Sequence, residues 1–93
     1  MIKSFCHKGL ETFYRTGSKV GIQAGHAAKL RILLTALDAA ETPDDLRMPL
    51  SWRLHSLKGE RLGDWSLTVN GNWRVTFRFE ESDVVLVDYE DYH

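Results

Sequence analysis

The sequence predicts an α+β domain in which an N-terminal strand and two helices pack on one face of an antiparallel sheet. Apolar and polar residues alternate over residues 65–69 and 73–79, a period typical of half-buried antiparallel strands. An apolar stripe with helical spacing runs from Ala27 to Leu37. The helical patterns precede most of the strand patterns, and helices segregated from strands favour the α+β class.

Length and composition indicate a single domain spanning residues 1–93. The chain is 43% hydrophobic and 27% charged, which is ordinary for a globular protein. No apolar run approaches the roughly 18 residues of a membrane span, and residues 1–4 do not resemble a signal peptide. Cys6 is the single cysteine, which excludes an internal disulfide. We therefore expect a cytoplasmic protein.

The first part of the chain predicts a short strand and two helices. Residues 2–5 are apolar enough for an opening strand. Residues 8–15 carry apolar side chains at helical spacing, and a second helix is expected from His26 onward. Together these elements supply the layer that covers one face of the sheet.

A third helix start and another strand are predicted in the middle of the chain. Thr42 and Pro43 are followed by two aspartates. Threonine is a good cap, proline suits the first helical position, and carboxylates favour a helix N-terminus. Residues 50–54 then look like a strand.

The Asn70-Gly71 dipeptide predicts a hairpin between the two alternating runs. A two-residue loop places apolar side chains opposite charged ones. A three-residue loop over 70–72 instead pairs Val69 with Trp73 and keeps the other apolar residues opposite one another. Because a slip of one residue turns every side chain to the other face, the buried face selects the longer loop.

In this register Arg74 and Arg78 point together off the opposite face of the sheet. We expect that face to be free for a ligand, although the two arginines can equally form an ordinary solvated face paired with the acidic last segment. The following run, residues 84–87, is apolar at every position. This indicates a strand covered on both sides and leaves its register open.

Six residues that are distant in sequence can meet on such a sheet. The sequence has no metal-ligand spacing and no Gly-rich phosphate loop, so we expect no metal and no cofactor. The six include imidazoles for proton transfer near neutral pH, cations for a phosphate, and a ring that can stack on a base. This inventory suits cleavage of RNA by its own 2′-hydroxyl. The candidate catalytic residues are His55, Lys58, Arg74, Asp91, Tyr92 and His93.

The same residues make the sequence similar to a known family. A His-x-x-Lys-Gly element lies at 55–59, Asn-Trp-Arg at 72–74, and Asp-Tyr-His at 91–93. In combination, and over essentially the whole chain, these elements resemble the HigB-type toxins, the host-inhibition-of-growth or killer-protein branch of the RelE/ParE superfamily. The resemblance implies a compact RelE-like fold of the microbial-RNase type.

The resemblance also implies a function. Toxins of this family are ribosome-dependent mRNA endonucleases that cut the codon in the ribosomal A site and arrest translation. Their chemistry needs no metal and leaves a 2′,3′-cyclic phosphate and a 5′-hydroxyl. The partner it implies is a small helix-turn-helix antitoxin of the HigA type. The family's catalytic positions fall on the six candidates named above.

The charge of the chain departs from that family pattern. Many such toxins are clearly basic, whereas this chain has a formal net charge of −1. The average hides a basic block over residues 47–78 and an acidic last segment. We therefore expect binding to RNA and the ribosome to rest on the arginines of that block. Besides Arg74, these are Arg47, Arg53, Arg61 and Arg78.

Two other functions on the same fold stay open at the level of sequence. One is a ParE-like gyrase inhibitor, which His55, Lys58 and His93 disfavour because toxins of that kind lack the histidine-lysine centre. The other is a non-catalytic relative that only forms a repressor complex with its antitoxin. The complete set of six side chains disfavours this alternative without excluding it.

Overall fold

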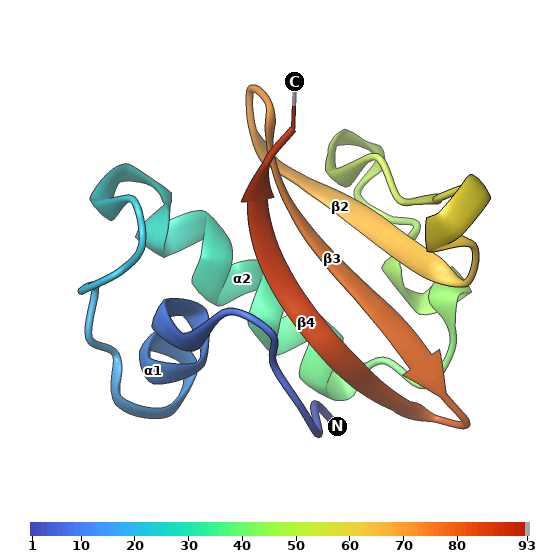
Figure 1. Ribbon diagram of the computed structural model, residues 1–93, viewed down its shortest axis with the longest axis horizontal. Coiled ribbons are helices and arrows are strands. Elements are labelled where there is room, and N and C mark those ends of the chain that lie inside the picture. Colours follow the sequence, from blue (N-terminus) through green and yellow to red (C-terminus); the bar gives the residue numbers. More distant parts are fainter. Residues whose placement is uncertain (93) are drawn as a thin grey trace.

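The computed structural model describes residues 1–92 and contains two α-helices on one face of a curved antiparallel sheet (Figure 1). The helices are α1 (Lys8–Thr16) and α2 (Ala27–Ala39), and the 3-10 turns are η1 (Ala24–His26), η2 (Pro43–Leu46), η3 (Leu50–Trp52) and η4 (Gly59–Arg61). The strands are β1 (His55–Ser56), β2 (Asp64–Asn70), β3 (Trp73–Glu80) and β4 (Asp83–Asp91), in the sheet order β1-β2-β3-β4. The expected α+β class is confirmed. Candidate residue His93 lies outside the described residues.

The N-terminal segment runs alongside β4 without forming a regular strand. Isolated parallel bridges join Ile2 to Val84 and Phe5 to Val87. Between these bridges the backbone N–H of Lys3 donates to the carbonyl of Val84 at 2.8 Å. The expected strand at residues 2–5 is therefore reduced to two bridges, and it lies at the edge of the sheet rather than in the layer that covers its face. It covers the outer edge of β4, which protects that edge from pairing with another chain.

Both predicted helices form, and each has a local cause. The Nδ1 atom of His7 accepts the backbone N–H of Leu10 at 2.9 Å and caps α1. The apolar stripe of α2 is buried as predicted, with Leu30, Leu33 and Leu37 fully covered. The helix start predicted at Thr42, with room for about one turn before Pro49, forms as the short turn η2.

The predicted strand at residues 50–54 is wrong. Residues Leu50–Trp52 form the 3-10 turn η3, and Arg53 has a left-handed backbone with φ of 52°. A left-handed residue interrupts an extended chain. The turn buries Trp52 in the core while Leu50 stays 75% exposed, so the apolar alternation that indicated a strand does not reflect a buried sheet face. Pairing with β2 begins only at His55.

The predicted hairpin register is confirmed away from the turn and wrong next to it. Leu67 pairs with Val75 as predicted, and the next apolar pair along the strands also matches. At the turn, however, Asn70 rather than Val69 pairs with Trp73, because the register shifts between Thr68 and Asn70. Such a bulge adds one residue to one strand. It shortens the loop while keeping the side chain of Val69 only 6% exposed.

A second register shift answers the question left open for residues 84–87. Thr76 pairs with Asp88, whereas Arg78 pairs with Val85, so β4 carries one extra residue between these pairs. Leu86 takes up the irregularity, with φ of 56° and a 49% exposed side chain. The bulge therefore buries valines of both parities and fixes which acidic residues of β4 face the sheet surface.

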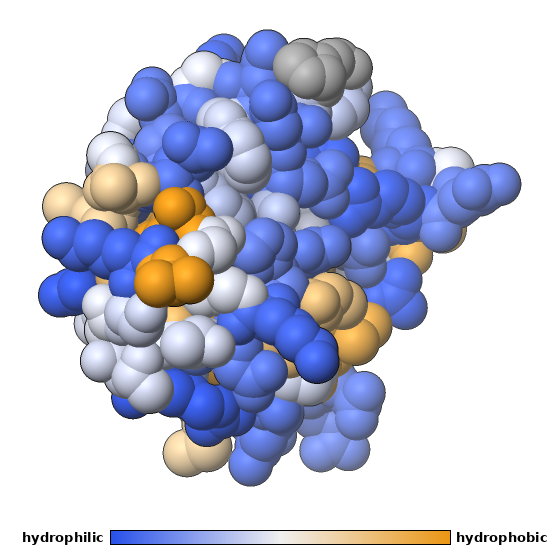
Figure 2. All heavy atoms as spheres, turned by 60° about the vertical axis from the view of Figure 1, so that its left-hand side comes forward, coloured by the Kyte–Doolittle hydropathy of each residue, from blue (hydrophilic) through white to orange (hydrophobic). Residues whose placement is uncertain are grey.

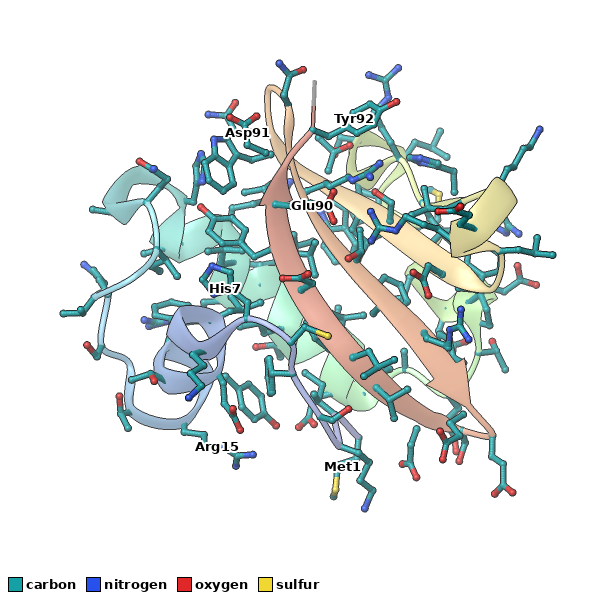
Figure 3. All side chains as sticks on the ribbon, in the orientation of Figure 1. Met1, His7, Arg15, Glu90, Asp91 and Tyr92 are labelled. Carbon is teal, nitrogen blue, oxygen red and sulfur yellow. The ribbon has the colours of Figure 1, made fainter. Side chains whose placement is uncertain are left out.

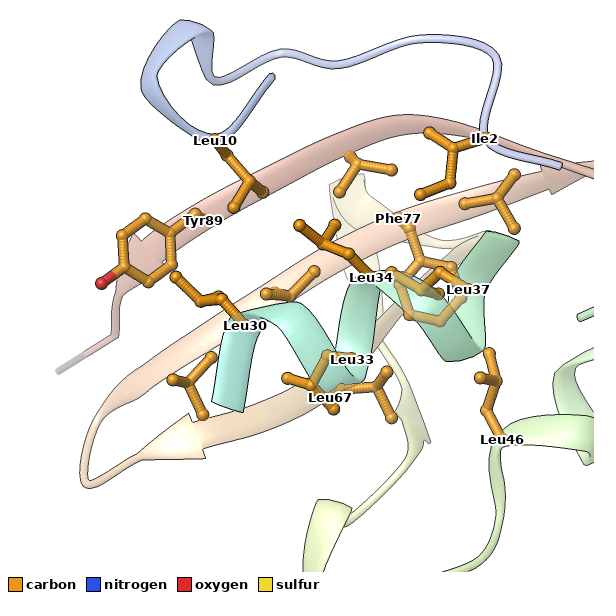
Figure 4. Close-up of a cluster of buried hydrophobic side chains, with 14 of the residues drawn as sticks. Ile2, Leu10, Leu30, Leu33, Leu34, Leu37, Leu46, Leu67, Phe77 and Tyr89 are labelled. Atoms are coloured by element: carbon orange, nitrogen blue, oxygen red, sulfur yellow. The ribbon is translucent and has the colours of Figure 1, made fainter. Parts of the chain in front are cut away.

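The main core lies between α2 and the sheet (Figure 4). Leucines of α2 pack on the inward side chains of β2, β3 and β4, among which Leu67, Val75 and Phe77 are at most 1% exposed. Full burial of one such side chain contributes about 1.5–3 kcal/mol. The rigid sheet that results is the platform on which the polar residues of the other face are positioned.

The opposite face of the sheet is only partly open, which corrects the expectation that it is left free. Ser66 and Thr76 lie at its centre and are 1% and 2% exposed. The loop that contains η4 lies over this region, since Nη2 of Arg61 donates to Oγ1 of Thr76 at 3.2 Å. A hollow lies on this face at the end of the sheet near Arg74.

The side of the molecule that bears the helices is mainly hydrophilic (Figure 2). Figure 2 shows the side that lies to the left in Figure 1, where apolar side chains gather only in small separate patches. Exposed large apolar residues of the helical layer include Val20 and Ile32. Within residues 1–92, no helix has the length and apolar character that crossing a membrane requires.

Candidate active site

A hollow of about 190 Å³ opens on the sheet face opposite α2, where the β2–β3 turn meets the end of β4. It brings together three of the six candidate catalytic residues, His55, Arg74 and Tyr92. Figure 3 shows Tyr92 and Glu90 near the C-terminal end of β4, on the ribbon that leads to this hollow. The full set of lining residues is His55, Leu57, Ser66, Thr68, Gly71, Asn72, Trp73, Arg74 and Tyr92.

Arg74 is held in one orientation from two sides. Its Nη2 donates to Oε2 of Glu90 at 3.1 Å, and its side chain is only 12% exposed. The central carbon of the guanidinium lies 4.1 Å from the centre of the Tyr92 ring, a cation–π distance. The Nε atom is buried and has no hydrogen-bond partner within residues 1–92. The guanidinium is therefore fixed in place with donor capacity left for a ligand.

Glu90 joins Arg74 to a second arginine. Nη1 of Arg61 donates to both carboxylate oxygens of Glu90, at 3.0 and 3.1 Å, and Nε of Arg61 lies 3.5 Å from Asp64. Burial acts to lower the pKa of Arg61, but the hydrogen bonds and charge of Glu90, together with Asp64, outweigh it and the pKa is raised. The carboxylate of Glu90 is thus shared between two permanent cations, and it anchors Arg74 to the loop that covers the sheet.

His55 is exposed on β1 at the rim of the hollow. Its Nδ1 lies 2.9 Å from the carbonyl oxygen of Arg53. A carbonyl can only accept, so Nδ1 carries the proton and, in the neutral ring, Nε2 is the atom that can accept one. The left-handed turn at Arg53 thereby sets the tautomer of His55, and it leaves His55 equipped as a base.

The end of the chain is held against the β2–β3 turn. The backbone N–H of Tyr92 donates to the carbonyl of Asn72 at 2.7 Å, and Asp91 pairs with Trp73 across β3 and β4. The ring of Tyr92 is 55% exposed, so one of its faces covers Arg74 while much of the ring stays accessible. His93, the sixth candidate, lies outside the described residues.

Lys58 does not line the hollow in the described structure. It is exposed and directly follows Leu57, which does line it. The backbone N–H of Leu57 donates to the carbonyl of Asp64 at 2.9 Å and fixes the start of this loop. The long flexible side chain of Lys58 therefore begins at the rim of the hollow.

The four arginines predicted to bind RNA lie outside the hollow, and three of them have acidic partners within the chain. Arg47 pairs with Asp44 beside η2. Arg61 pairs with Glu90 and Asp64, and Arg78 donates to Asp64 at 2.9 Å and to the carbonyl of Leu62 at 3.0 Å. Arg53 is exposed in the turn before β1. Much of the basic block seen in the sequence is therefore neutralised locally.

Several residues of the hollow were not predicted from the sequence. Ser66 and Thr68 share the face of Arg74, because Thr68 is its direct partner across β2 and β3 and Ser66 is two residues away on the same strand. This parity was available from the predicted hairpin and was the signal that could have found them. Glu90 is the direct partner of Arg74 on β4, but this pairing depends on the undecided register of the last strand.

An aromatic cluster around the Trp73 ring packs on the other face of the sheet, against the start of α2. The rings of Trp73 and Tyr89 are 4.6 Å apart, and the Tyr89 hydroxyl lies 2.6 Å from Nδ1 of the buried His26. Burial raises the pKa of Tyr89. The cluster links the start of α2 to the sheet and limits movement of the Trp73 ring.

The arrangement is suited to binding and cleaving a phosphodiester. A fixed guanidinium binds phosphate oxygens and stabilises charge that develops on them. A neutral imidazole that lines the same hollow can take a proton from a hydroxyl, and an exposed ring can stack on an unpaired base. Among residues 1–92, no three His, Cys, Asp or Glu side chains come together as a metal site.

Comparison with known proteins agrees with this geometry. A family described as the RelE-like toxin of type II toxin-antitoxin system HigB matches residues 3–93. The chain is 43% identical over 93 residues to Endoribonuclease HigB of Proteus vulgaris, with the whole of both chains covered. It is also 34% identical over 98 residues to Toxin HigB-1 of Vibrio cholerae, with all of this chain and 98% of that relative covered.

Solved structures with low sequence identity share the fold. A mutant of YafQ from E. coli superposes with a TM-score of 0.62 at 14% identity, over 98% of this chain and 93% of that one. A YoeB/ParE toxin from Agrobacterium tumefaciens gives a TM-score of 0.58 at 18% identity over the whole of both chains. The fold is thus that of these toxins, and the chain belongs to the HigB-like family of RelE-like toxins of type II toxin-antitoxin systems.

Proposed function

We propose that this chain is an endoribonuclease toxin that enters the ribosomal A site, cuts the mRNA codon there and so inhibits translation and growth. A relative named as an endoribonuclease, identical at 43% of positions over its full length, supports the activity. The observation that carries the proposal is the hollow in which Arg74, His55 and Tyr92 converge. It offers a phosphate ligand, a base and a stacking surface within one site.

The proposed reaction is attack of the RNA on itself. The 2′-oxygen loses its proton and bonds to phosphorus, the bond from phosphorus to the 5′-oxygen breaks, and that oxygen takes up a proton. The products are a 2′,3′-cyclic phosphate and a 5′-hydroxyl. Charge grows on the phosphate oxygens in the transition state, where preorganised cations stabilise it best.

Each candidate residue has a role in this reaction. Arg74 and Lys58 bind the phosphate and stabilise the charge of the transition state. His93 transfers a proton, and Asp91 orients the imidazole of His93. His55 supplies a second proton transfer or electrostatic stabilisation. The tautomer set by the Arg53 carbonyl suits His55 to the step in which a proton is accepted. The sixth residue, Tyr92, packs on a base of the codon, for which its 55% exposed ring is available.

The partners we propose are mRNA, the small ribosomal subunit at the A site, and a helix-turn-helix antitoxin of the HigA type; the site of action is the cytoplasm. The chain as a whole has no net positive charge that would attract it to the ribosome. Arg47, Arg61 and Arg78 pair with acidic residues of their own chain, so the exposed Arg53 is the best placed of the four arginines for long-range attraction.

The test is mRNA cleavage by the purified protein with and without ribosomes, comparing wild type with Arg74→Ala. We expect cleavage only when ribosomes are present and its loss in the variant. Cleavage of free mRNA at the same rate would contradict the dependence on ribosomes. No cleavage under either condition, with the antitoxin still bound, would favour the non-catalytic alternative, and inhibition of gyrase would favour the ParE-like one.

A further inference from the structure

Two buried polar atoms in the described part of the chain have no hydrogen-bond partner, and both belong to the hollow. They are Oγ of Ser66 and Nε of Arg74. Ser66 is only 1% exposed. Native proteins pair nearly all of their buried polar groups. Two unpaired groups at one place therefore indicate that a ligand supplies their partner.

The strand register places Ser66 between the candidate base and the phosphate-binding arginine. Ser66 pairs directly with His55 on β1, and Arg74 lies diagonally across β2 and β3 from it. Side chains directly opposite one another have Cβ atoms about 5 Å apart, and diagonal neighbours are within reach of a long side chain. A single phosphate group can therefore contact Ser66 and Arg74 while lying beside His55.

Thr76 provides an internal contrast. It is the partner of Ser66 across β2 and β3, lies on the same face and is equally buried. Its hydroxyl, however, accepts Nη2 of Arg61 at 3.2 Å. The fold therefore satisfies one of these two neighbouring hydroxyls and leaves the other, the one that lines the hollow, unpaired.

We propose that Ser66 contacts the substrate, its hydroxyl donating a hydrogen bond to a non-bridging oxygen of the phosphodiester that Arg74 also binds. This inference rests on the proposed function and adds a residue to it. The donor gains strength as negative charge grows on that oxygen. Both unpaired atoms are covered in the free chain, so the RNA must displace a lining side chain. Tyr92 suits this step, since its ring is 55% exposed and covers Arg74, and in the proposed function this ring packs on a base of the codon.

The test separates a role in substrate binding from a role in folding. In Ser66→Ala the unpaired hydroxyl is removed, so we expect the melting temperature to stay the same or rise. The rate of single-turnover cleavage of mRNA on ribosomes should fall roughly 10- to 100-fold, which is the effect expected when a hydrogen bond to a charged group is lost. Thr76→Val is the matched control for stability, because it removes a paired hydroxyl and should lower the melting temperature.

Inorganic phosphate gives a readout that does not depend on cleavage. We expect phosphate to stabilise the wild type against heat relative to chloride at equal ionic strength, and to stabilise Ser66→Ala less. A variant that cleaves at the wild-type rate, or that loses stability together with activity, would overturn the role of Ser66. If the wild type cleaves nothing on ribosomes, the proposed function fails and the phosphate comparison alone decides whether Ser66 binds an anion.

Discussion

Replacing Glu90 with glutamine tests whether the internal ion pairs position Arg74 for catalysis. The substitution keeps the size of the side chain but removes the charge that holds Arg61 and Arg74 together. The side chains of Arg74, Glu90 and Arg61 are 12%, 29% and 38% exposed, so water screens these pairs in part. We therefore expect an unfolding free energy lower by about 1–2 kcal/mol, between the values for exposed and buried charged hydrogen bonds.

Glu90→Gln should change the cleavage rate and the ribosome affinity in opposite directions. Arg74 loses its fixed orientation, and a misplacement of about 1 Å can slow a reaction roughly 100-fold. We expect the single-turnover rate at saturating ribosomes to fall about 10- to 100-fold. Ribosome affinity should rise instead, because the formal net charge changes from −1 to 0 and Arg61 loses one of its two acidic partners. A variant that simply unfolds would lose both rate and affinity.

Glu41→Gln is the matched control, since it makes the same change of charge at an exposed position in the loop after α2. It should leave the single-turnover rate unchanged. Thermal unfolding of the wild type and both variants measures the loss of stability. A loss of 1–2 kcal/mol corresponds to a melting temperature lower by roughly 5–15 °C. If Glu90→Gln cleaves as fast as Glu41→Gln, Glu90 does not position Arg74 and the reasoning is refuted.

Three further predictions concern single residues. Lys58→Ala should slow single-turnover cleavage by about 10²–10³-fold, the effect of losing a transition-state donor, with an unchanged melting temperature because Lys58 is exposed; an unchanged rate would remove Lys58 from the mechanism. Tyr89→Phe should lower the unfolding free energy by about 1–2 kcal/mol, measured in urea, because it leaves the buried His26 without its 2.6 Å partner; equal stability would contradict this. The pKa of Asp38 in the folded protein is lowered, chiefly by the backbone N–H of Ile2. Ionised Asp38 therefore stabilises the fold above its pKa in the unfolded chain, about 4, and this stabilisation is lost as the pH falls through its pKa in the folded protein. Asp38→Asn should therefore be less stable than wild type at pH 7, by less than about 1 kcal/mol for so exposed a carboxylate, and the difference should vanish in acid; the same difference in urea titrations at pH 7 and pH 3 would contradict it.

The sequence predicted those features that depend on local periodicity. The stripe of α2 and the alternation in β2 and β3 each reflect a single buried face, so the helices, the paired strands and the outward direction of Arg74 followed from spacing alone. The strand expected at residues 50–54 shows the limit of the same method. Its apolar residues alternate, but Leu50 faces solvent, Trp52 enters the core and Leu54 is only partly buried against it.

The parts of the site that could not be predicted depend on the two bulges. A bulge has no periodic signature, and each one changes which residues face each other beyond it. The bulge in β4 brings Glu90 opposite Arg74, whereas the sequence offered several acidic residues for that place. The basic block was overestimated for a different reason, because charges that cluster in sequence proved to be paired in space.

The most direct test of the proposed reaction uses mRNA carrying a single 2′-deoxynucleotide at the cleaved position of a codon in the A site of programmed ribosomes. The proposed chemistry requires the 2′-oxygen at that position. We predict that unmodified mRNA yields a 2′,3′-cyclic phosphate and a 5′-hydroxyl, and that the deoxy substitution abolishes the cut. Cleavage of the deoxy mRNA at the same link, leaving a 3′-hydroxyl, would contradict attack by the 2′-oxygen.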